Sequence, residues 1–248
     1  MTDLHCHILP AIDDGAKNVD ISMRLLRMQN DSGITDIVST PHFNPEHQNL
    51  DEFIAKRFNS ARRLADAVFH SELPMRLKFG AEVRISPTIL ELDPHPLCFQ
   101  KTSVMLLEMP MSLRPQWDVN VVYQLAIMGI IPLIAHIERY PYVQKNPNIA
   151  LKWVEAGAFL QVNASSITDG WVHRNLVYKL LKHGLVHVIA SDTHSPERRP
   201  PQLGSAMHML AKKFGNEICK KLECNAQLLF NGQAPDVELP TSFSERAR

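Results

Sequence analysis

The sequence predicts a single α/β domain in which a parallel sheet is covered by helices. Its 248 residues match the size of one α/β barrel, and an apolar fraction of 45% is enough for a large core. Short apolar runs alternate with amphipathic segments, which is the order of parallel strands joined by helices. This alternation does not decide between an open and a closed sheet. We find no repeat or linker, so we expect one domain over 1–248, with a frayed polar tail from about 232.

The individual elements follow from apolar spacing and from glycines that end helices. The predicted strands are 4–8, 34–39, 77–81, 104–107, 131–135, 159–162 and 186–191. The predicted helices are 19–30, 50–70, 119–128, 149–155, 172–182, 205–214 and 217–222. Seven strands mostly alternate with helices in this list.

Composition excludes several classes of partner. Charged residues make up 21% of the chain and cancel to a net charge of zero, so bulk charge favours neither nucleic acid nor an anionic membrane. The start, MTDLHCHILP, lacks the features of a signal peptide, and no apolar stretch approaches the roughly 20 residues of a membrane helix. The four cysteines are scattered without a CxxC pair. We therefore expect a cytoplasmic protein without direct membrane insertion.

Histidines and carboxylates recur at the ends of the predicted strands. His5 and His7 lie two apart on the first strand and so project from one face. The other candidates follow strand ends or lie in the first loop, namely Asp14, His42, Glu82, Glu108, His136, Asp192 and His194. Each alone has a simple explanation as a turn, a polar strand face or a helix cap. Because the carboxyl ends of parallel barrel strands meet at one mouth, their joint occurrence predicts a metal site.

The composition of this set narrows the chemistry. Five histidines and four carboxylates are too many for one four-coordinate zinc ion. Nitrogen and oxygen ligands without thiolate favour Mn, Fe, Zn or Co. Three divalent ions would carry more positive charge than four carboxylates neutralise, and the surplus would attract a phosphate ester. A water activated by such metals, with a pKa of about 7, would then serve as the nucleophile.

Two arginines are predicted to lie over the same mouth. Arg139 follows His136 by three residues, and Arg199 follows His194 by five. A guanidinium binds phosphate oxygens through paired N–H donors, so both are candidates for substrate binding. Arg198 is the alternative to Arg199, because a shift of one residue would exchange them.

Apolar side chains near these positions suggest a rim for an aromatic leaving group. Phe43, Met109 and Tyr140 are the candidates, with core packing as the alternative for each. The seven remaining histidines are expected to be structural or exposed. Among these, His47 stands nearest to the candidate site, in the loop after His42.

At these residues the sequence resembles the PHP (polymerase and histidinol phosphatase) superfamily. The shared pieces are DLHCH at 3–7, DDG at 13–15, TPH at 40–42, GAE at 80–82 and SDTH at 191–194. Within it, the chain is similar to the bacterial metal-dependent tyrosine-protein phosphatases of capsule and exopolysaccharide loci. That similarity rests on HILPAIDDGAK at 7–17, LLEMP at 106–110, AHIERY at 135–140, VNASS at 162–166 and SDTHSPERRPP at 191–201.

The resemblance implies a distorted (β/α)7 TIM-like barrel with three divalent metal ions, Mn²⁺ foremost. It assigns His5, His7, Glu82 and Asp192 to one ion, and Glu82, Glu108 and His136 to a second. Asp14, His42 and His194 would hold the third. It further implies that Arg139 and Arg199 bind phosphate, and that His42 and Asp192 are needed for catalysis. The implied partner is a membrane-associated, autophosphorylating tyrosine kinase of polysaccharide biosynthesis; an oligomer is compatible with the sequence.

Three other functions compete with this hypothesis. A cysteine-dependent tyrosine phosphatase needs an arginine six residues after its cysteine, and none of the four cysteines has one. A phosphatase for histidinol phosphate or a similar metabolite would use the same ligands, so it stays as the alternative. A metal-bound adaptor without turnover is the alternative from another class. A nuclease is disfavoured because the chain shows no basic stripe.

Overall fold

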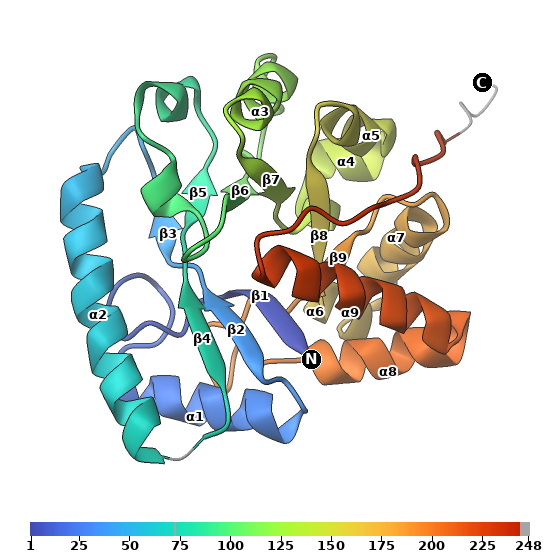
Figure 1. Cartoon of the computed structure of the whole chain (residues 1–248). Helices are drawn as coiled ribbons and strands as arrows, with labels where there is room; N and C mark the ends of the chain where they lie inside the picture. The colour runs from blue at the N-terminus through green and yellow to red at the C-terminus, as the bar shows by residue number, and fades with distance from the viewer. Residues whose placement is uncertain (72, 244–248) are drawn as a thin grey trace.

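The computed structural model describes residues 1–71 and 73–243. Its strands in this part are β1 (Thr2–Cys6), β2 (Asp36–Ser39), β3 (His42–Phe43), β4 (Arg76–Phe79), β5 (Glu82–Arg84), β6 (Val104–Glu108), β7 (Ile131–Ile134), β8 (Phe159–Asn163) and β9 (Val188–Ala190). Its helices are α1 (Val19–Asp31), α2 (Leu50–Ser71), α3 (Asp118–Ile127), α4 (Pro141–Lys145), α5 (Asn148–Glu155), α6 (Ser165–Thr168), α7 (Trp171–Lys182), α8 (Leu203–Phe214) and α9 (Asn216–Phe230). Short 3-10 helices are η1 (Pro87–Glu91), η2 (His95–Leu97) and η3 (Ile137–Arg139). Figure 1 shows the helices arranged around the strands.

The strands occupy seven positions around a barrel, and all neighbours are parallel. They pair in the orders β1–β2–β4 and β3–β5–β6–β7–β8–β9. The ladder continues across the two breaks, because the Gly80 amide donates to the Ser39 carbonyl (2.9 Å) and the Glu82 amide to the Pro41 carbonyl (3.0 Å). β3 thus extends the position of β2, and β5 that of β4.

The barrel closes between β9 and β1. Cys6 forms a parallel bridge with Thr193, and the His7 amide donates to the Thr193 carbonyl at 2.8 Å. The Asp192 amide donates to the His5 carbonyl at 2.8 Å. The predicted distorted (β/α)7 barrel is therefore confirmed.

The barrel interior is filled by apolar side chains near the amino ends of the strands. Leu4, Val104, Leu133 and Val188 pack there with Phe230 of α9. Because α9 contacts both β1 and β9, it covers this end of the barrel. A second apolar layer lies between the strands and the outer helices. The carboxyl ends of the strands are left for polar side chains.

Local sequence sets the helix limits as expected. The Asn18 side chain caps α1 by accepting from the Ile21 amide at 2.9 Å, and Gly33 follows the helix with a φ of 80°. The predicted helices are all present, and α9 extends beyond the predicted 217–222. The two-residue β3 and three-residue β5 were not predicted, since pairing with neighbours rather than apolar spacing defines such short strands.

The described end of the chain packs against other segments. The segment 232–243 has no helix or strand, yet the Phe243 ring stacks on His183 at 3.8 Å and its amide donates to Asn148. The frayed tail from about 232 stays a prediction, and residues 244–248 lie outside the described part. Across the described residues, no helix combines the length and apolarity needed to cross a membrane.

Candidate metal centre

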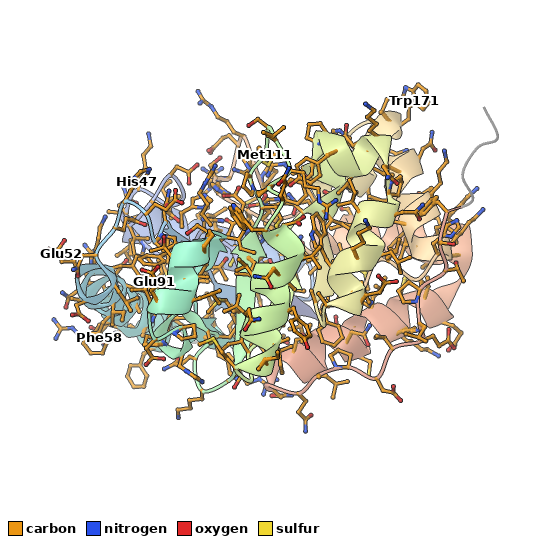
Figure 2. The ribbon with its side chains drawn as sticks, turned by 90° about the horizontal axis from the view of Figure 1, so that it is seen from above. His47, Glu52, Phe58, Glu91, Met111 and Trp171 are labelled. Carbon is orange, nitrogen blue, oxygen red and sulfur yellow. The ribbon has the colours of Figure 1, made fainter. Side chains whose placement is uncertain are left out.

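The predicted metal ligands gather at the mouth of the barrel. Figure 2 identifies this side, because His47, Met111 and Trp171, which follow β3, β6 and β8 in sequence, lie along one edge of the molecule. Eight of the nine candidates form three overlapping groups whose ligand atoms lie within 4.8 Å of one another. The groups are His7–Asp14–His42–His194, His5–His7–Asp192 and His42–Glu82–Glu108. The ninth, His136, lies beside Glu82.

Glu82 is the centre of the cluster. Its Oε1 lies 2.8 Å from His136 Nε2, while its Oε2 lies 3.2 Å from both His5 Nε2 and His7 Nε2. His42 Nδ1 is 3.1 Å from the same Oε2. Burial by itself raises the pKa of this carboxyl, but the charge of His5 and the surrounding ring nitrogens hold its pKa well below its usual range. The carboxylate form is the one that binds metal.

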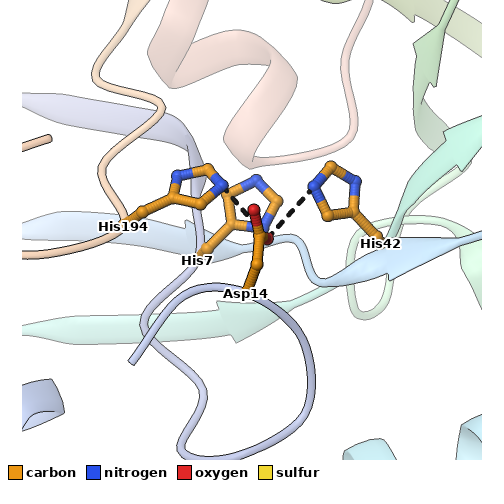
Figure 3. Close-up of side chains that lie close together, drawn as sticks. All are labelled: His7, Asp14, His42 and His194. Carbon is orange, nitrogen blue, oxygen red and sulfur yellow. Dashed lines mark ion pairs between the residues drawn. The ribbon is translucent and has the colours of Figure 1, made fainter. Parts of the chain in front are cut away.

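The group nearest to solvent contains Asp14. His42 Nε2 and His194 Nε2 each lie 3.4 Å from Asp14 Oδ1. Figure 3 marks both ion pairs with dashed lines. His7 stacks on His194 with ring centroids 3.9 Å apart. The Asp14 side chain is 65% exposed and that of His42 is 40% exposed, so this side of the cluster is open to a substrate.

Strand register and tight loops place these side chains. His42 of β3 pairs with Glu82 of β5 across the ladder, so the two side chains lie on one face as neighbours. The loop that carries Asp14 lies against β1 so closely that a Cβ on Gly15 would stand 2.1 Å from the His7 carbonyl oxygen. Asp192 has a φ of 51°, a strained conformation that clusters at functional sites.

The arrangement of lone pairs fits bound cations. His5 Nε2 and His7 Nε2 lie only 3.2 Å apart, a separation that requires a proton or a cation to offset the repulsion of two lone pairs. Glu82 Oε2 and His194 Nε2 are buried and form no hydrogen bond with the described residues. Buried acceptors that converge without donors match the inner ligands of a divalent metal.

Asp13 is a functional candidate that the sequence analysis missed. Its Oδ2 lies 2.7 Å from His7 Nδ1 and accepts from the His42 amide at 3.2 Å. Burial alone raises the pKa of Asp13, but the hydrogen bond with His7 lowers it to about 2. Asp13 thus orients His7, with Nε2 toward the cluster. The feature of the sequence that could have indicated Asp13 is that it is a second carboxylate directly before Asp14.

Both predicted arginines reach the cluster, and Arg198 does not. Arg139 Nη1 lies 3.2 Å and Arg199 Nη2 lies 2.6 Å from the same atom, Asp192 Oδ2. Their side chains are 38% and 41% exposed, so part of each guanidinium faces the mouth. The Arg198 side chain is exposed and forms no ion pair with the described residues.

The suggested apolar rim is wrong in all three positions. Phe43, Met109 and Tyr140 are at most 1% exposed and belong to the core. The Tyr140 hydroxyl donates to the Ala135 carbonyl and accepts from the Met109 amide, both at 2.9 Å. Successive side chains beside a strand end point alternately toward the mouth and toward the core. The sequence alone did not show which of these two directions the three side chains take. His47 is exposed and outside the ligand groups.

Comparison with known proteins agrees with this geometry. The chain is 31% identical over 237 residues to the tyrosine-protein phosphatase YwqE of Bacillus subtilis, covering 94% of this chain and 92% of that protein. It is 29% identical over 233 residues to the tyrosine-protein phosphatase CpsB of Streptococcus pneumoniae, covering 90% and 94%.

Solved structures extend the comparison to the fold. A structure described as that of YwqE and CpsB, metal-dependent tyrosine phosphatases, superposes with a TM-score of 0.91 at 30% identity, over 99% of this chain and all of that one. A lactonase of Listeria monocytogenes shares the fold alone, with a TM-score of 0.56 at 12% identity over 91% and 93% of the two chains. The family model for capsular polysaccharide synthesis, CpsB/CapC, matches residues 1–231. This chain therefore belongs to the CpsB/CapC family.

Proposed function

We propose that this chain is a metal-dependent protein-tyrosine phosphatase. One observation carries the proposal: two half-exposed guanidiniums share Asp192 Oδ2, while Asp192 Oδ1 faces the histidine cluster at 3.4 Å from His5 Nε2. A phosphate at the mouth would thus meet cation-binding ligands on one side and arginine N–H donors on the other. Relatives named as tyrosine-protein phosphatases support the same activity.

The ligand groups support three divalent ions, with Mn²⁺ as the proposed metal. His5, His7, Glu82 and Asp192 would hold one, Glu82, Glu108 and His136 a second, and Asp14, His42 and His194 the third. Bound there, such ions would neutralise phosphate charge and acidify a water for attack on phosphorus. In the structure His42 adjoins Glu82 and Glu108 as well as Asp14, which places it between two of these groups.

The chain's own residues then bind and orient the phosphate. Each guanidinium has five N–H donors, and contact with Asp192 uses only part of them. Arg139 and Arg199 can therefore donate to phosphate oxygens while Asp192 holds them in place. As charge grows on those oxygens in the transition state, fixed donors stabilise it without reorganisation.

The two buried cysteines, Cys6 and Cys98, are not suited to act as nucleophiles. Cys6 stands between two ligand histidines but is fully buried, and burial raises the pKa of its thiol well above its usual value. Its Sγ lies 3.4 Å from the Val38 carbonyl, away from the cluster. Burial likewise raises the pKa of Cys98 to about 12. A thiol in this state does not attack phosphorus, which agrees with the missing arginine motif.

A protein substrate is proposed from the relatives named as tyrosine-protein phosphatases, and the mouth side offers exposed apolar side chains that it could contact. Trp171 lies on the mouth side and is 71% exposed, and Leu113, in the segment after β6, is 78% exposed. We propose a phosphotyrosine segment of a membrane-associated tyrosine kinase of polysaccharide synthesis as the substrate, with the reaction in the cytoplasm.

Metal reconstitution tests this function. The protein is stripped with chelator, restored with Mn²⁺, and assayed for phosphate release from a tyrosine-phosphorylated peptide and from histidinol phosphate. We expect metal-dependent release with a much higher kcat/KM for the peptide. Preference for histidinol phosphate would overturn the substrate, and no release from folded, metal-loaded protein would favour the adaptor.

A further inference from the structure

Strand β8 supplies no metal ligand, yet it ends in two polar side chains inside the metal centre. Gln161 and Asn163 lie two apart, so they project from the same face of β8. Gln161 is fully buried and Asn163 is 3% exposed. Two buried side-chain amides in an otherwise apolar strand need hydrogen-bond partners. Each of their side-chain hydrogen bonds joins them to a predicted metal ligand or to each other.

One backbone amide fixes the orientation of both side chains. The His136 N–H lies 2.9 Å from Gln161 Oε1. Since a backbone N–H can only donate, the atom facing it is the amide oxygen. Gln161 Nε2 must then donate to Asn163 Oδ1 at 2.8 Å, and Asn163 Nδ2 to Asp192 Oδ2 at 2.7 Å. The donors all point from β7 toward β9.

The same oxygen determines the tautomer of His5. His5 Nδ1 lies 3.2 Å from Gln161 Oε1, which can only accept, so Nδ1 carries the proton. In the neutral ring, the form that binds metal, the lone pair is then on Nε2, which lies 3.2 Å from both His7 Nε2 and Glu82 Oε2. That is the tautomer in which His5 can bind a metal through Nε2.

At its other end the chain of amides selects one oxygen of Asp192. Asn163 holds Oδ2, together with Arg139 and Arg199, which leaves Oδ1 beside His5 and His7 at 3.4 and 3.6 Å. Asp192 also has the strained φ of 51°, so its side chain needs support from outside its own segment. Asn163 provides that support from the neighbouring strand.

We propose that Gln161 and Asn163 are positioning residues that prepare the centre for metal before it binds. Resting on the proposed function, this inference assigns them to two ligands: Gln161 sets the His5 tautomer, and Asn163 directs Asp192 Oδ1 to the metal. Substitution of residues that hold metal ligands in this way typically weakens metal binding by about tenfold to a hundredfold.

Isosteric substitutions test this role directly. Gln161→Met and Asn163→Leu keep the volume and remove the hydrogen bonds. Gln29→Met is the matched control, because Gln29 is equally buried on α1 and no hydrogen bond joins its side chain to a predicted metal ligand among the described residues. Mn²⁺ affinity is measured by calorimetry on chelator-stripped protein, and the apo fold by circular dichroism and thermal unfolding.

We expect about tenfold to a hundredfold weaker Mn²⁺ binding in both site variants, wild-type affinity in Gln29→Met, and recovery of kcat at high Mn²⁺. If Gln161→Met does not fold, Gln161→Asn keeps an amide in the core but withdraws it from His5 and His136, and should weaken binding in the same direction. Mn²⁺ affinities within twofold of wild type in the folded site variants would refute the inference. Absence of Mn²⁺ binding by the wild type would refute the proposed function instead.

Discussion

Two histidines at opposite ends of the barrel, His7 and His187, are buried to the same depth with opposite electrostatic results. At the mouth, burial alone would lower the pKa of His7, but the hydrogen bond with Asp13 and the adjacent Glu82 carboxylate raise it to about 10. At the opposite end, burial lowers the pKa of His187 to about 4, and the Lys221 cation adds to the effect. His7 is fully buried and His187 is 2% exposed. Carboxylate neighbours, rather than depth, therefore account for the difference between these two histidines.

The arrangement of core residues explains why the ends differ. At the amino ends of the strands, Val104, Val188 and Phe230 form an apolar floor. At the carboxyl ends, predicted ligands replace apolar residues, and their charges are balanced only within the cluster. The cost of burying them is met by mutual contacts and, in the proposed function, by metal. Substitutions at the two ends should therefore act on different properties.

The largest effect is expected from His42→Ala. His42 adjoins both Asp14 and Glu82, so its loss should disrupt two ligand groups. We expect kcat/KM for a phosphotyrosyl peptide to fall by about a thousandfold or more, because several kcal/mol of charge stabilisation is lost. Apo stability should change little, since the side chain is 40% exposed. Wild-type turnover in folded His42→Ala would contradict the three-metal assignment. His187→Asn, at the opposite end of the barrel, is the control and should have wild-type turnover at neutral pH.

The next effect separates two adjacent arginines. Arg199→Ala should lower kcat/KM by about a hundredfold, as removal of a fixed donor to a developing oxyanion does. Arg198→Ala should cost less than about threefold, as is usual for an exposed side chain without an ion pair. Steady-state kinetics of the two variants with the same peptide make the comparison. A larger loss in Arg198→Ala would show that the arginine at the mouth has been misassigned.

Much of this organisation follows from the sequence because the signal is periodic. Strand ends can be located from apolar runs, and polar residues at those ends identify the mouth; the ligand candidates at His5, His42 and Asp192 were found in this way. The register of the arginines does not follow, because the sequence left Arg198 as the alternative to Arg199; in the structure it is Arg199 that lies against Asp192.

The features of the site that the sequence did not predict depend on contacts between segments that are far apart in the chain. Asp13 orients His7 across a loop, and Gln161 reaches His5 from a strand 156 residues away in sequence. No local pattern distinguishes Gln161 from an ordinary polar residue, and Asp13 is marked only by its position next to Asp14. Tyr140 was misplaced for the same reason, because its hydroxyl finds buried partners at Ala135 and Met109 only in the folded chain.

A steric change in the loop against β1 should have a smaller effect. Gly15→Ala would place a Cβ 2.1 Å from the His7 carbonyl oxygen, so the loop must shift. We expect a loss of about 3 kcal/mol in the free energy of unfolding, together with weaker Mn²⁺ binding. Gly129→Ala is the control: its Cβ meets nothing within 4 Å, but φ is 82°, so about 1 kcal/mol is expected without any change in metal binding. The free energy of unfolding is measured in urea. If Gly15→Ala and Gly129→Ala lose the same amount, the loop that carries Gly15 can move without an energetic cost, and the steric argument is wrong.

The smallest effect concerns the opposite end of the barrel and its response to acid. Because the folded pKa of His187, about 4, lies below its ordinary value of 6.5, its contribution to stability is complete above pH 6.5 and is lost as pH falls toward 4. His187→Asn keeps an acceptor for the Leu160 amide, which His187 Nδ1 accepts at 2.9 Å, but cannot titrate. Between pH 7.5 and pH 5 the chelator-treated wild type should lose about 2 kcal/mol more unfolding free energy than this variant. Taking the difference between the wild type and the variant removes the contribution of the mouth histidines, which both proteins share. If both proteins lose the same unfolding free energy between pH 7.5 and pH 5, His187 does not remain neutral in the folded state.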